Sequence, residues 1–250
     1  MENLELLVDL HRNTERQGPG GEAETLQAMH LAGLDTDTPL EIADIGCGTG
    51  ASTLLLAREL NARVNAVDLM PEFIAELRGK AAAQGLSDRI TARVEAMDAL
   101  SFDDEAFDVV WSEGAVYNIG FERGAKAWRC FLRPGGILAV SEVTWLTDER
   151  PPELQAFWSE AYPEIDTAAG KIRVLERAGY TPIGYFVLSE RCWLDHYYRP
   201  LRGRFEAFLE RHGHSVDARA LVQAEQDEMA MYERYKAYFS YGFYIARKTA

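Results

Sequence analysis

The chain has 250 residues, of which 47% are hydrophobic and 26% charged, a composition typical of a folded globular protein. Its 26 basic and 40 acidic side chains give a formal net charge of −14. This charge repels nucleic-acid phosphates and anionic membrane surfaces, so neither is expected as a partner. The sequence also lacks an apolar run near the ~20 residues that a membrane-spanning helix needs.

The three cysteines, Cys47, Cys130 and Cys192, lie far apart in the sequence. Their spacing fits neither a disulfide framework nor a zinc site, and it favours reduced thiols in a cytoplasmic protein. The acidic start of the chain is unlike a signal peptide. The histidines and acids form no recognised metal-binding motif either, so we predict no metal site.

Two helices are expected within the first forty residues. Apolar spacing places Leu4, Leu7, Val8 and His11 on one face of the first helix. A break containing glycines and a proline, over residues 16–21, separates it from the second helix. This break is either a mobile flap over a site or a plain connector.

From residue 40 onward, predicted strands alternate with predicted helices. Strands are expected over 40–45, 64–68, 90–96, 107–112 and 137–142, with helices over 49–60, from 71 onward and over 122–132 between them. In the helix that begins at Pro71, the residues Phe73, Ile74, Leu77 and Ala81 share one apolar face. This alternation is typical of a doubly wound parallel sheet in the α/β class.

The last hundred residues interrupt this alternation and then return to it. An aromatic-rich insertion covers 144–165, and a helix over 171–178 leads to a strand over 180–189, placed at a sheet edge because it contains Pro182. A long helix follows, with Leu221, Val222, Met229, Tyr232 and Phe239 facing inward, before a final strand over 241–248. We therefore expect seven strands in one domain over 1–250, with cap segments at about 1–24, 144–168 and 190–216.

The first predicted strand runs into a glycine loop over residues 44–50, which read DIGCGTG. Glycines let the backbone turn tightly and approach a ligand closely, and Asp68 at the end of the second strand could accept both hydrogens of a ribose diol. Together these features indicate a nucleoside site. The spacing Gly46-x-Gly48-x-x-Ala51 also fits a dinucleotide, but the Asp44 carboxylate would oppose a pyrophosphate and favour a cationic ligand.

Residues 40–142 resemble the core of the class I S-adenosylmethionine-dependent methyltransferases. The segment 44–50 is similar to the acidic G-x-G-x-G motif of that superfamily, and Asp68 to the acid that binds the ribose hydroxyls. Met97 and Asp98 resemble the pair that frames the adenine, and the segments 107–110 and 132–136 resemble two later motifs. The flanks over 16–20, 111–124 and 147–151 are similar to a bacterial group of small-molecule methyltransferases related to the quinone-biosynthesis C-methyltransferases.

The resemblance implies a fold, a cofactor and a reaction. The fold is a Rossmann-like seven-stranded sheet of order 3-2-1-4-5-7-6 with strand 7 antiparallel. The reaction is in-line transfer of a methyl group from S-adenosyl-L-methionine to a small-molecule acceptor, with S-adenosyl-L-homocysteine as the product. The residues that it implies for cofactor binding are Gln17, Asp44, Gly46, Cys47, Gly48, Gly50, Asp68, Leu69, Met97, Asp98 and Glu113.

Three side chains are candidates for catalysis. Glu113, at the end of the fourth strand, is either the general base, a contact to the methionine end of the cofactor, or a structural residue that caps a helix. Tyr117 is either a residue that orients the acceptor or part of the core, and His196 is a further candidate base. Glu142, at the end of the fifth strand, is either a substrate contact or a buried carboxylate with its own partner.

The identity of the acceptor stays open between several chemistries. The rings of the cap segments could form a box for a cationic amine, a slot for a flat aromatic acceptor, or simply a small core. Five arginines over residues 191–211 fit either an anionic acceptor or a solvated helix face. Two rival functions remain, an NAD(P)-dependent oxidoreductase and a non-catalytic nucleoside-binding module, and a homodimer through the long C-terminal helix stays open.

Overall fold

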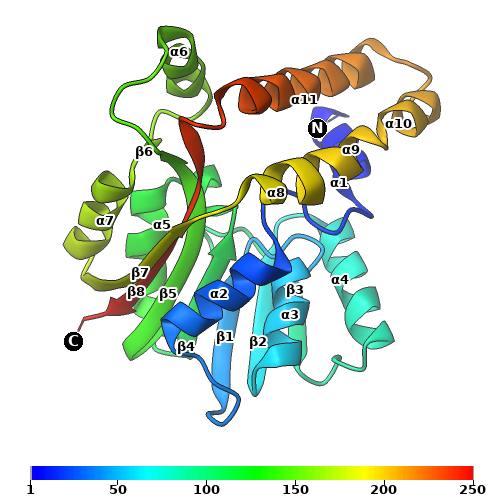
Figure 1. Cartoon of the computed structure of the whole chain (residues 1–250). Coiled ribbons are helices and arrows are strands. Elements are labelled where there is room, and N and C mark those ends of the chain that lie inside the picture. Colours follow the sequence, from blue (N-terminus) through cyan, green and yellow to red (C-terminus); the bar gives the residue numbers. More distant parts are fainter. Residues whose placement is uncertain (1, 250) are drawn as a thin grey trace.

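A mixed β-sheet forms the centre of the computed structural model, which describes residues 2–249 (Figure 1). The strand order is β3-β2-β1-β4-β5-β8-β7, and β1 to β5 pair in parallel while β8 is antiparallel to both of its neighbours. The strands are β1 (Leu40–Ile45), β2 (Ala62–Asp68), β3 (Ile90–Val94), β4 (Phe107–Glu113), β5 (Leu132–Trp145), β7 (Tyr180–Val187) and β8 (Phe239–Lys248). A two-residue strand, β6 (Asp166–Thr167), pairs with β5 outside this order. Apart from this short strand, the predicted order is confirmed.

Helices cover both faces of the sheet. One face carries α2 (Glu22–Ala32), α3 (Ala51–Glu59) and α4 (Pro71–Ala83), and the opposite face carries α5 (Phe121–Trp128) and α7 (Ala168–Arg177). Side chains alternate between the two cores along each strand, as Val109 and Val110 of β4 do. The four residues predicted for the inner face of α4 are all buried.

The remaining helices lie across the carboxyl ends of the parallel strands (Figure 1). The N-terminal helix α1 packs against α10 and α11 there. These cap elements are α1 (Glu2–His11), α8 (Glu190–Trp193), the π-helical turn η3 (Leu194–Tyr198), α9 (Arg199–Arg202), α10 (Phe205–Arg211) and α11 (Val216–Tyr235). The helix α6 (Pro152–Ala161) follows β5, and two short 3-10 turns are η1 (Val116–Asn118) and η2 (Arg129–Phe131). None of the helices within residues 2–249 is both long and apolar enough to cross a bilayer.

Several predicted boundaries differ from the structure. The helix expected over 122–132 ends at Trp128, and β5 begins at Leu132, so the Pro-Gly-Gly turn lies within the strand. Leu132 pairs with Phe107, and a register shift between Phe107 and Val109 accommodates the turn. Phe239, predicted to belong to the long helix, is the first residue of β8 instead. The prediction of an edge strand at Pro182 is confirmed, because β7 ends the strand order.

The first helix buries only part of the face that its sequence predicts, because Val8 and His11 of that face are buried and its two leucines are not. Its buried side chains include Leu6 and Leu10, whereas Leu4 and Leu7 are 46% and 38% exposed. The helix has apolar side chains on two sides, because it packs on the other cap helices with one side and borders a cavity with the other. The exposed leucines therefore belong to the site described next.

Candidate functional site

A cavity of about 610 Å³ lies between the carboxyl ends of the parallel strands and the cap helices. The strand order reverses between β1 and β4, and in open α/β sheets this is the place where ligands bind. Most residues expected at the site line the cavity: Gln17, Gly46, Cys47, Gly48, Asp68, Leu69, Met97, Asp98, Glu113 and Tyr117. Asp44, Gly50 and His196 are not among its lining residues.

The glycine loop forms one wall of the cavity, and its backbone requires glycine. Gly46 has a φ angle of +76°, and a Cβ there would collide with the Cβ of Ala115. Gly48 has a φ angle of +54°, and a Cβ there would collide with the side chain of Gln17. The loop thus presents bare backbone to the cavity, which leaves room for a ligand close to the main chain.

Asp68 closes the loop from the end of β2. Its Oδ2 accepts the N–H of Gly48 at 2.9 Å and its Oδ1 accepts the N–H of Met70 at 2.9 Å. Burial raises the pKa of this carboxyl above its ordinary value, while the two backbone donors favour its charged form. The carboxylate is therefore fixed in orientation, and its remaining lone pairs are free to accept hydroxyl groups of a ligand.

The loop after β3 forms the side of the cavity next to Asp68. The indole N–H of Trp128 donates to the carbonyl of Met97 at 3.0 Å, which ties this loop to α5. The neighbouring Asp98 forms an exposed ion pair with Arg123 at 3.2 Å. Leu69 is 56% exposed beside them, so this part of the cavity offers apolar contact together with one carboxylate.

Asp44 does not lie at the cavity, where the sequence predicts a ligand contact, whereas Cys47 does. The fully buried Asp44 accepts the hydroxyl groups of Ser52 and Thr53, at 2.8 and 2.6 Å, and so anchors the first turn of α3 below the loop. Burial raises the pKa of Asp44 to about 7. Cys47 does line the cavity, but burial raises the pKa of its thiol, so it is a neutral contact and no nucleophile. Gly50 is the N-cap of α3 and lies against Leu77.

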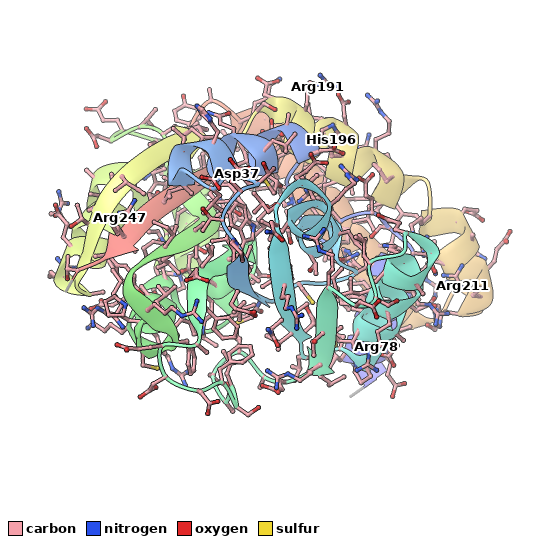
Figure 2. The ribbon with its side chains drawn as sticks, turned by 90° about the horizontal axis from the view of Figure 1, so that it is seen from below. Asp37, Arg78, Arg191, His196, Arg211 and Arg247 are labelled. Atoms are coloured by element: carbon pink, nitrogen blue, oxygen red, sulfur yellow. The ribbon has the colours of Figure 1, made fainter. Side chains whose placement is uncertain are left out.

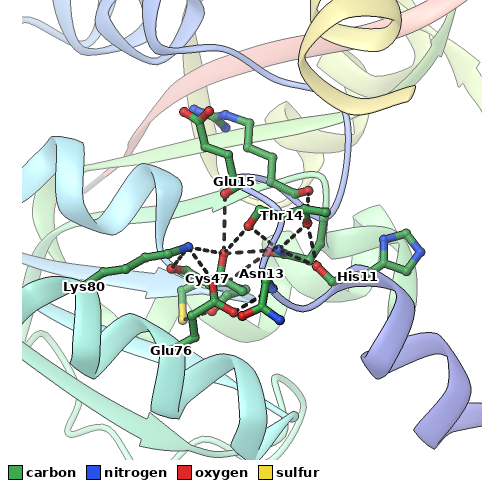
Figure 3. A network of polar contacts seen from close by, with 11 residues as sticks. His11, Asn13, Thr14, Glu15, Cys47, Glu76 and Lys80 are labelled. Carbon is green, nitrogen blue, oxygen red and sulfur yellow. Dashed lines mark hydrogen bonds and ion pairs between the residues drawn. The ribbon is translucent and has the colours of Figure 1, made fainter. Parts of the chain in front are cut away.

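A polar network fastens the segment after α1 to the glycine loop, and Figure 3 shows its members Asn13, Glu76 and Lys80. Gln17 belongs to this network. The backbone N–H of Thr49 donates to Gln17 Oε1 at 2.9 Å, and Gln17 Nε2 donates to Thr49 Oγ1 at 3.1 Å. From α4, Lys80 donates to Thr49 Oγ1 at 2.9 Å and pairs with Glu76, which also accepts the N–H of Asn13. The predicted break after α1 is thus held in place over the site.

Glu113 is occupied by protein donors on both carboxylate oxygens. Its Oε2 pairs with Arg16 at 2.6 Å, and its Oε1 accepts from the hydroxyl of Thr25 at 2.7 Å and the indole N–H of Trp111 at 2.9 Å. Both side chains of the Arg16–Glu113 pair are more than nine-tenths buried. This arrangement suits a residue that fastens the N-terminal segment to β4, and it leaves little capacity for the general-base role.

The other two catalytic candidates lie in different surroundings. Tyr117 lines the cavity and is 44% exposed, with its ring edge-to-face against Tyr162 at 6.3 Å between centroids. His196 lies on the cap beside α2 (Figure 2), where its Nδ1 is 3.0 Å from the carbonyl oxygen of Gly20. Because His196 does not line the cavity, the structure gives it no access to an acceptor there.

His196 also belongs to a group that the sequence spacing did not reveal. Ligand atoms of Glu24, Cys192 and His196 all lie within 4.8 Å of one another, although α2 and α8 are far apart in sequence. Burial raises the pKa of the Cys192 thiol to about 12, which disfavours the thiolate that a metal would need.

The cap supplies cavity residues that sequence reasoning missed. His11, Tyr197, Glu225 and Glu228 line the cavity at the end formed by α1, η3 and α11, which we call the α11 end. Glu225 is only 9% exposed, because it lies on the inward-facing side of α11 among apolar residues. In the sequence, the signal for this part of the site is an acidic residue on the inward-facing side of a helix. A search for apolar periodicity alone does not detect such a residue.

Residues 42–136 match a family described as a methyltransferase domain. A 2-methyl-6-phytyl-1,4-hydroquinone methyltransferase of a Synechocystis species is 30% identical over 182 residues, covering 65% of this chain and 55% of that protein. A demethylmenaquinone methyltransferase of Bacteroides fragilis is 28% identical, covering 57% and 58%. The matched region thus spans little more than half the length of either relative.

Among solved structures, this fold is similar to that of a Geobacter sulfurreducens S-adenosylmethionine-dependent methyltransferase in complex with S-adenosyl-L-homocysteine. The TM-score is 0.82, and the match covers 98% of this chain and 97% of that one at 17% sequence identity. At this identity the likeness concerns the fold alone. It extends over the sheet and the cap segments together.

Proposed function

We propose that this chain, as a member of the class I S-adenosylmethionine-dependent methyltransferases, transfers the methyl group of S-adenosylmethionine to a small molecule. The observation that carries this proposal is the fixed Asp68 carboxylate next to a glycine loop in the same cavity. We also propose that residues 1–250 act as one unit. A cytoplasmic location agrees with the three free cysteines.

The residues at the cavity fit the cofactor. Gly46 and Gly48 line the cavity with backbone alone, which gives the cofactor close access to the main chain. Asp68 would accept the ribose hydroxyls, and Met97 and Asp98 would hold the base. When bound, the cofactor supplies an electrophilic methyl group on a sulfonium sulfur, and its leaving group is a neutral thioether.

The protein's own contribution is to position the acceptor and to exclude water. The α1 helix, the segment after it and α11 enclose the cavity opposite the glycine loop. An acceptor held there would be desolvated on several sides. Binding would also place it next to the methyl group, which lowers the entropy cost of bringing the two reactants together in the reaction. Tyr117 is the side chain at the end of β4 that is best placed to contact the acceptor, because it lines the cavity with its ring exposed.

The sequence argument against the oxidoreductase alternative does not hold in the structure. The charge of Asp44, once expected to repel a pyrophosphate, lies below the loop and is bound by two hydroxyl groups. The preference for a sulfonium cofactor therefore rests on the family and on the acid-rich lining: Asp68, Glu95, Asp98, Glu113, Glu225 and Glu228.

Calorimetric titration with S-adenosylhomocysteine, S-adenosylmethionine and NAD⁺ tests this proposal. We expect S-adenosylhomocysteine and S-adenosylmethionine to bind and NAD⁺ to give no heat of binding. Asp68→Asn should weaken binding by about tenfold or more, because a charged hydrogen-bond acceptor contributes about 1.5–3 kcal/mol. The matched control is Asp37→Asn on an exposed loop (Figure 2), which should bind like the wild type. Binding of NAD⁺ in place of the other two would overturn the proposal.

A further inference from the structure

The α11 end of the cavity holds acidic groups that the cofactor site does not use. Glu225 and Glu228 stand one helical turn apart on α11, and both line the cavity together with His11 and Tyr197. The ribose and base contacts proposed above belong to the glycine loop and to the ends of β2 and β3. The α11 end is therefore free to contact the acceptor.

Two buried acceptor atoms lack a donor at this end. Glu225 is 9% exposed and His11 5% exposed, and His11 Nε2 lies 3.1 Å from Glu225 Oε1. Glu225 Oε1 accepts from Nε2 in the His11 tautomer that carries its proton there, and in that tautomer Nδ1 is an acceptor. Within the described residues, neither Glu225 Oε2 nor His11 Nδ1 has a hydrogen-bond partner. Buried polar atoms are rarely left in this state without a ligand or water.

Glu228 adds a second acid whose charge the protein does not neutralise. Its Oε1 accepts from the hydroxyl group of Tyr198 at 2.9 Å. Burial and then the neighbouring charge of Glu225 raise the pKa of Glu228 to about 7. A cation bound between the two acids would remove this repulsion and favour the ionised form of both.

The basic groups nearby are already engaged or point away from the cavity. Within the described chain, Arg16 is the one lysine or arginine in the lining, and it is paired with Glu113. The arginines of the cap lie at the outside, as Figure 2 shows for Arg191 and Arg211, and Arg211 pairs with Asp9. An anionic acceptor therefore finds no available positive charge here.

Aromatic and apolar side chains complete the surroundings. The ring of Tyr197 stacks on His11, with 6.1 Å between centroids and 23° between planes. Tyr197 and Tyr117 both line the cavity, and aromatic faces attract cations. Leu4 and Leu7 of α1, exposed toward the cavity, offer an apolar surface beside the acids.

We propose that the methyl acceptor carries a protonated amine, which binds Glu225 and Glu228, and an apolar part, which packs against Leu4 and Leu7. This assignment rests on the proposed methyltransferase function. An ammonium group has three N–H donors, and it would find three acceptors: Glu225 Oε2, His11 Nδ1 and an oxygen of Glu228. The amine is thus the group by which the site recognises its acceptor.

The test is calorimetry at pH 8 on protein saturated with S-adenosylhomocysteine. The probes are tyramine and hexylamine, each compared with the alcohol and the carboxylate of the same skeleton. We expect each amine to bind about tenfold or more tightly than its alcohol, and the carboxylates not to bind. The preference should be lost in Glu225→Gln and in Glu228→Gln. The matched control Glu233→Gln lies on the exposed side of α11 and should keep it.

Affinity for S-adenosylhomocysteine separates the possible failures. A variant that still binds S-adenosylhomocysteine is folded at the cofactor site, so its preference for amines is informative. If one of the two glutamine variants fails to fold, the other still tests the proposal. The amine assignment is overturned if the alcohols or carboxylates bind as tightly as the amines, if no amine binds, or if both glutamine variants keep the preference. Failure of the wild type to bind S-adenosylhomocysteine would instead overturn the proposed function.

Discussion

At the scale of single residues, one buried ion pair shows how an expected substrate contact becomes a structural feature. Glu142 is at the end of the sequence-predicted fifth strand, where a contact to substrate was one of two interpretations. In the structure it is fully buried, and its Oε1 is 3.4 Å from Nζ of Lys171. The ammonium also lies 4.6 Å from the centre of the Phe121 ring. The partner comes from α7, so nothing local to β5 predicts it.

Removing the lysine alone should be costly. In Lys171→Met, the Glu142 carboxylate stays buried without its partner, and we expect the free energy of unfolding to fall by about 3–5 kcal/mol. The double variant Glu142→Gln with Lys171→Met removes the unpaired charge and should recover most of that loss. Urea unfolding measures both. Equal stabilities of the single and double variants would show that the ion pair is not what matters here.

At the scale of elements, the segment after α1 is held against the site by contacts to three different elements. Arg16 pairs with Glu113 of β4, Gln17 bonds to Thr49 of the glycine loop, and Asn13 bonds to Glu76 of α4 (Figure 3). The sequence left open whether this break is a flap or a connector. The contacts fasten this segment to the site, because the Arg16–Glu113 pair is buried and the Gln17–Thr49 hydrogen bonds are partly buried.

Glu113→Gln should loosen this segment. The variant leaves Arg16 buried without a counter-charge, so the segment should open more often and trypsin should cleave after Arg16 about tenfold faster. Glu122→Gln serves as the control, because it removes only an exposed ion pair with Lys126. Cleavage rates followed by mass spectrometry decide the matter. Unchanged cleavage in Glu113→Gln would contradict the role of this pair as an anchor.

At the scale of the whole molecule, buried acids make stability depend on pH. Burial raises the pKa values of both Asp44 and Glu228 to about 7 in the folded protein, from ordinary values of 3.8 and 4.5. At pH values between the ordinary pKa and the raised pKa, the folded state binds more protons than the unfolded state. The free energy of unfolding therefore falls as the pH rises through this range. Each group contributes a slope of up to about 1.4 kcal/mol per pH unit in that window.

We therefore expect the free energy of unfolding to decrease from pH 5 to pH 7 and to level off above about pH 7. Asp44→Asn keeps a polar side chain toward Ser52 and Thr53 but cannot ionise, so its slope should be smaller. Urea unfolding across this pH range, with the two proteins compared at each pH, isolates the contribution of Asp44. A slope that is the same in both would contradict the raised pKa.

The sequence predicted the sheet and the side of the cavity that the glycine loop forms. The glycine loop and Asp68 are local features that follow strands one and two, and parallel strands bring such turns to one edge. The α11 end depends on contacts between distant segments, as between His11 and Glu225, which are 214 residues apart. The exposed leucines of α1 were misplaced for the same reason, because a helix with apolar side chains on two sides does not reveal which side faces the core.

The most direct test of the account is a crystal structure of the protein with S-adenosyl-L-homocysteine. We expect the ligand in the cavity described here, with its ribose hydroxyls bound to Asp68, its base beside Met97 and Asp98, and the α11 end left open for an acceptor. A ligand bound elsewhere, or one whose ribose does not contact Asp68, would contradict it.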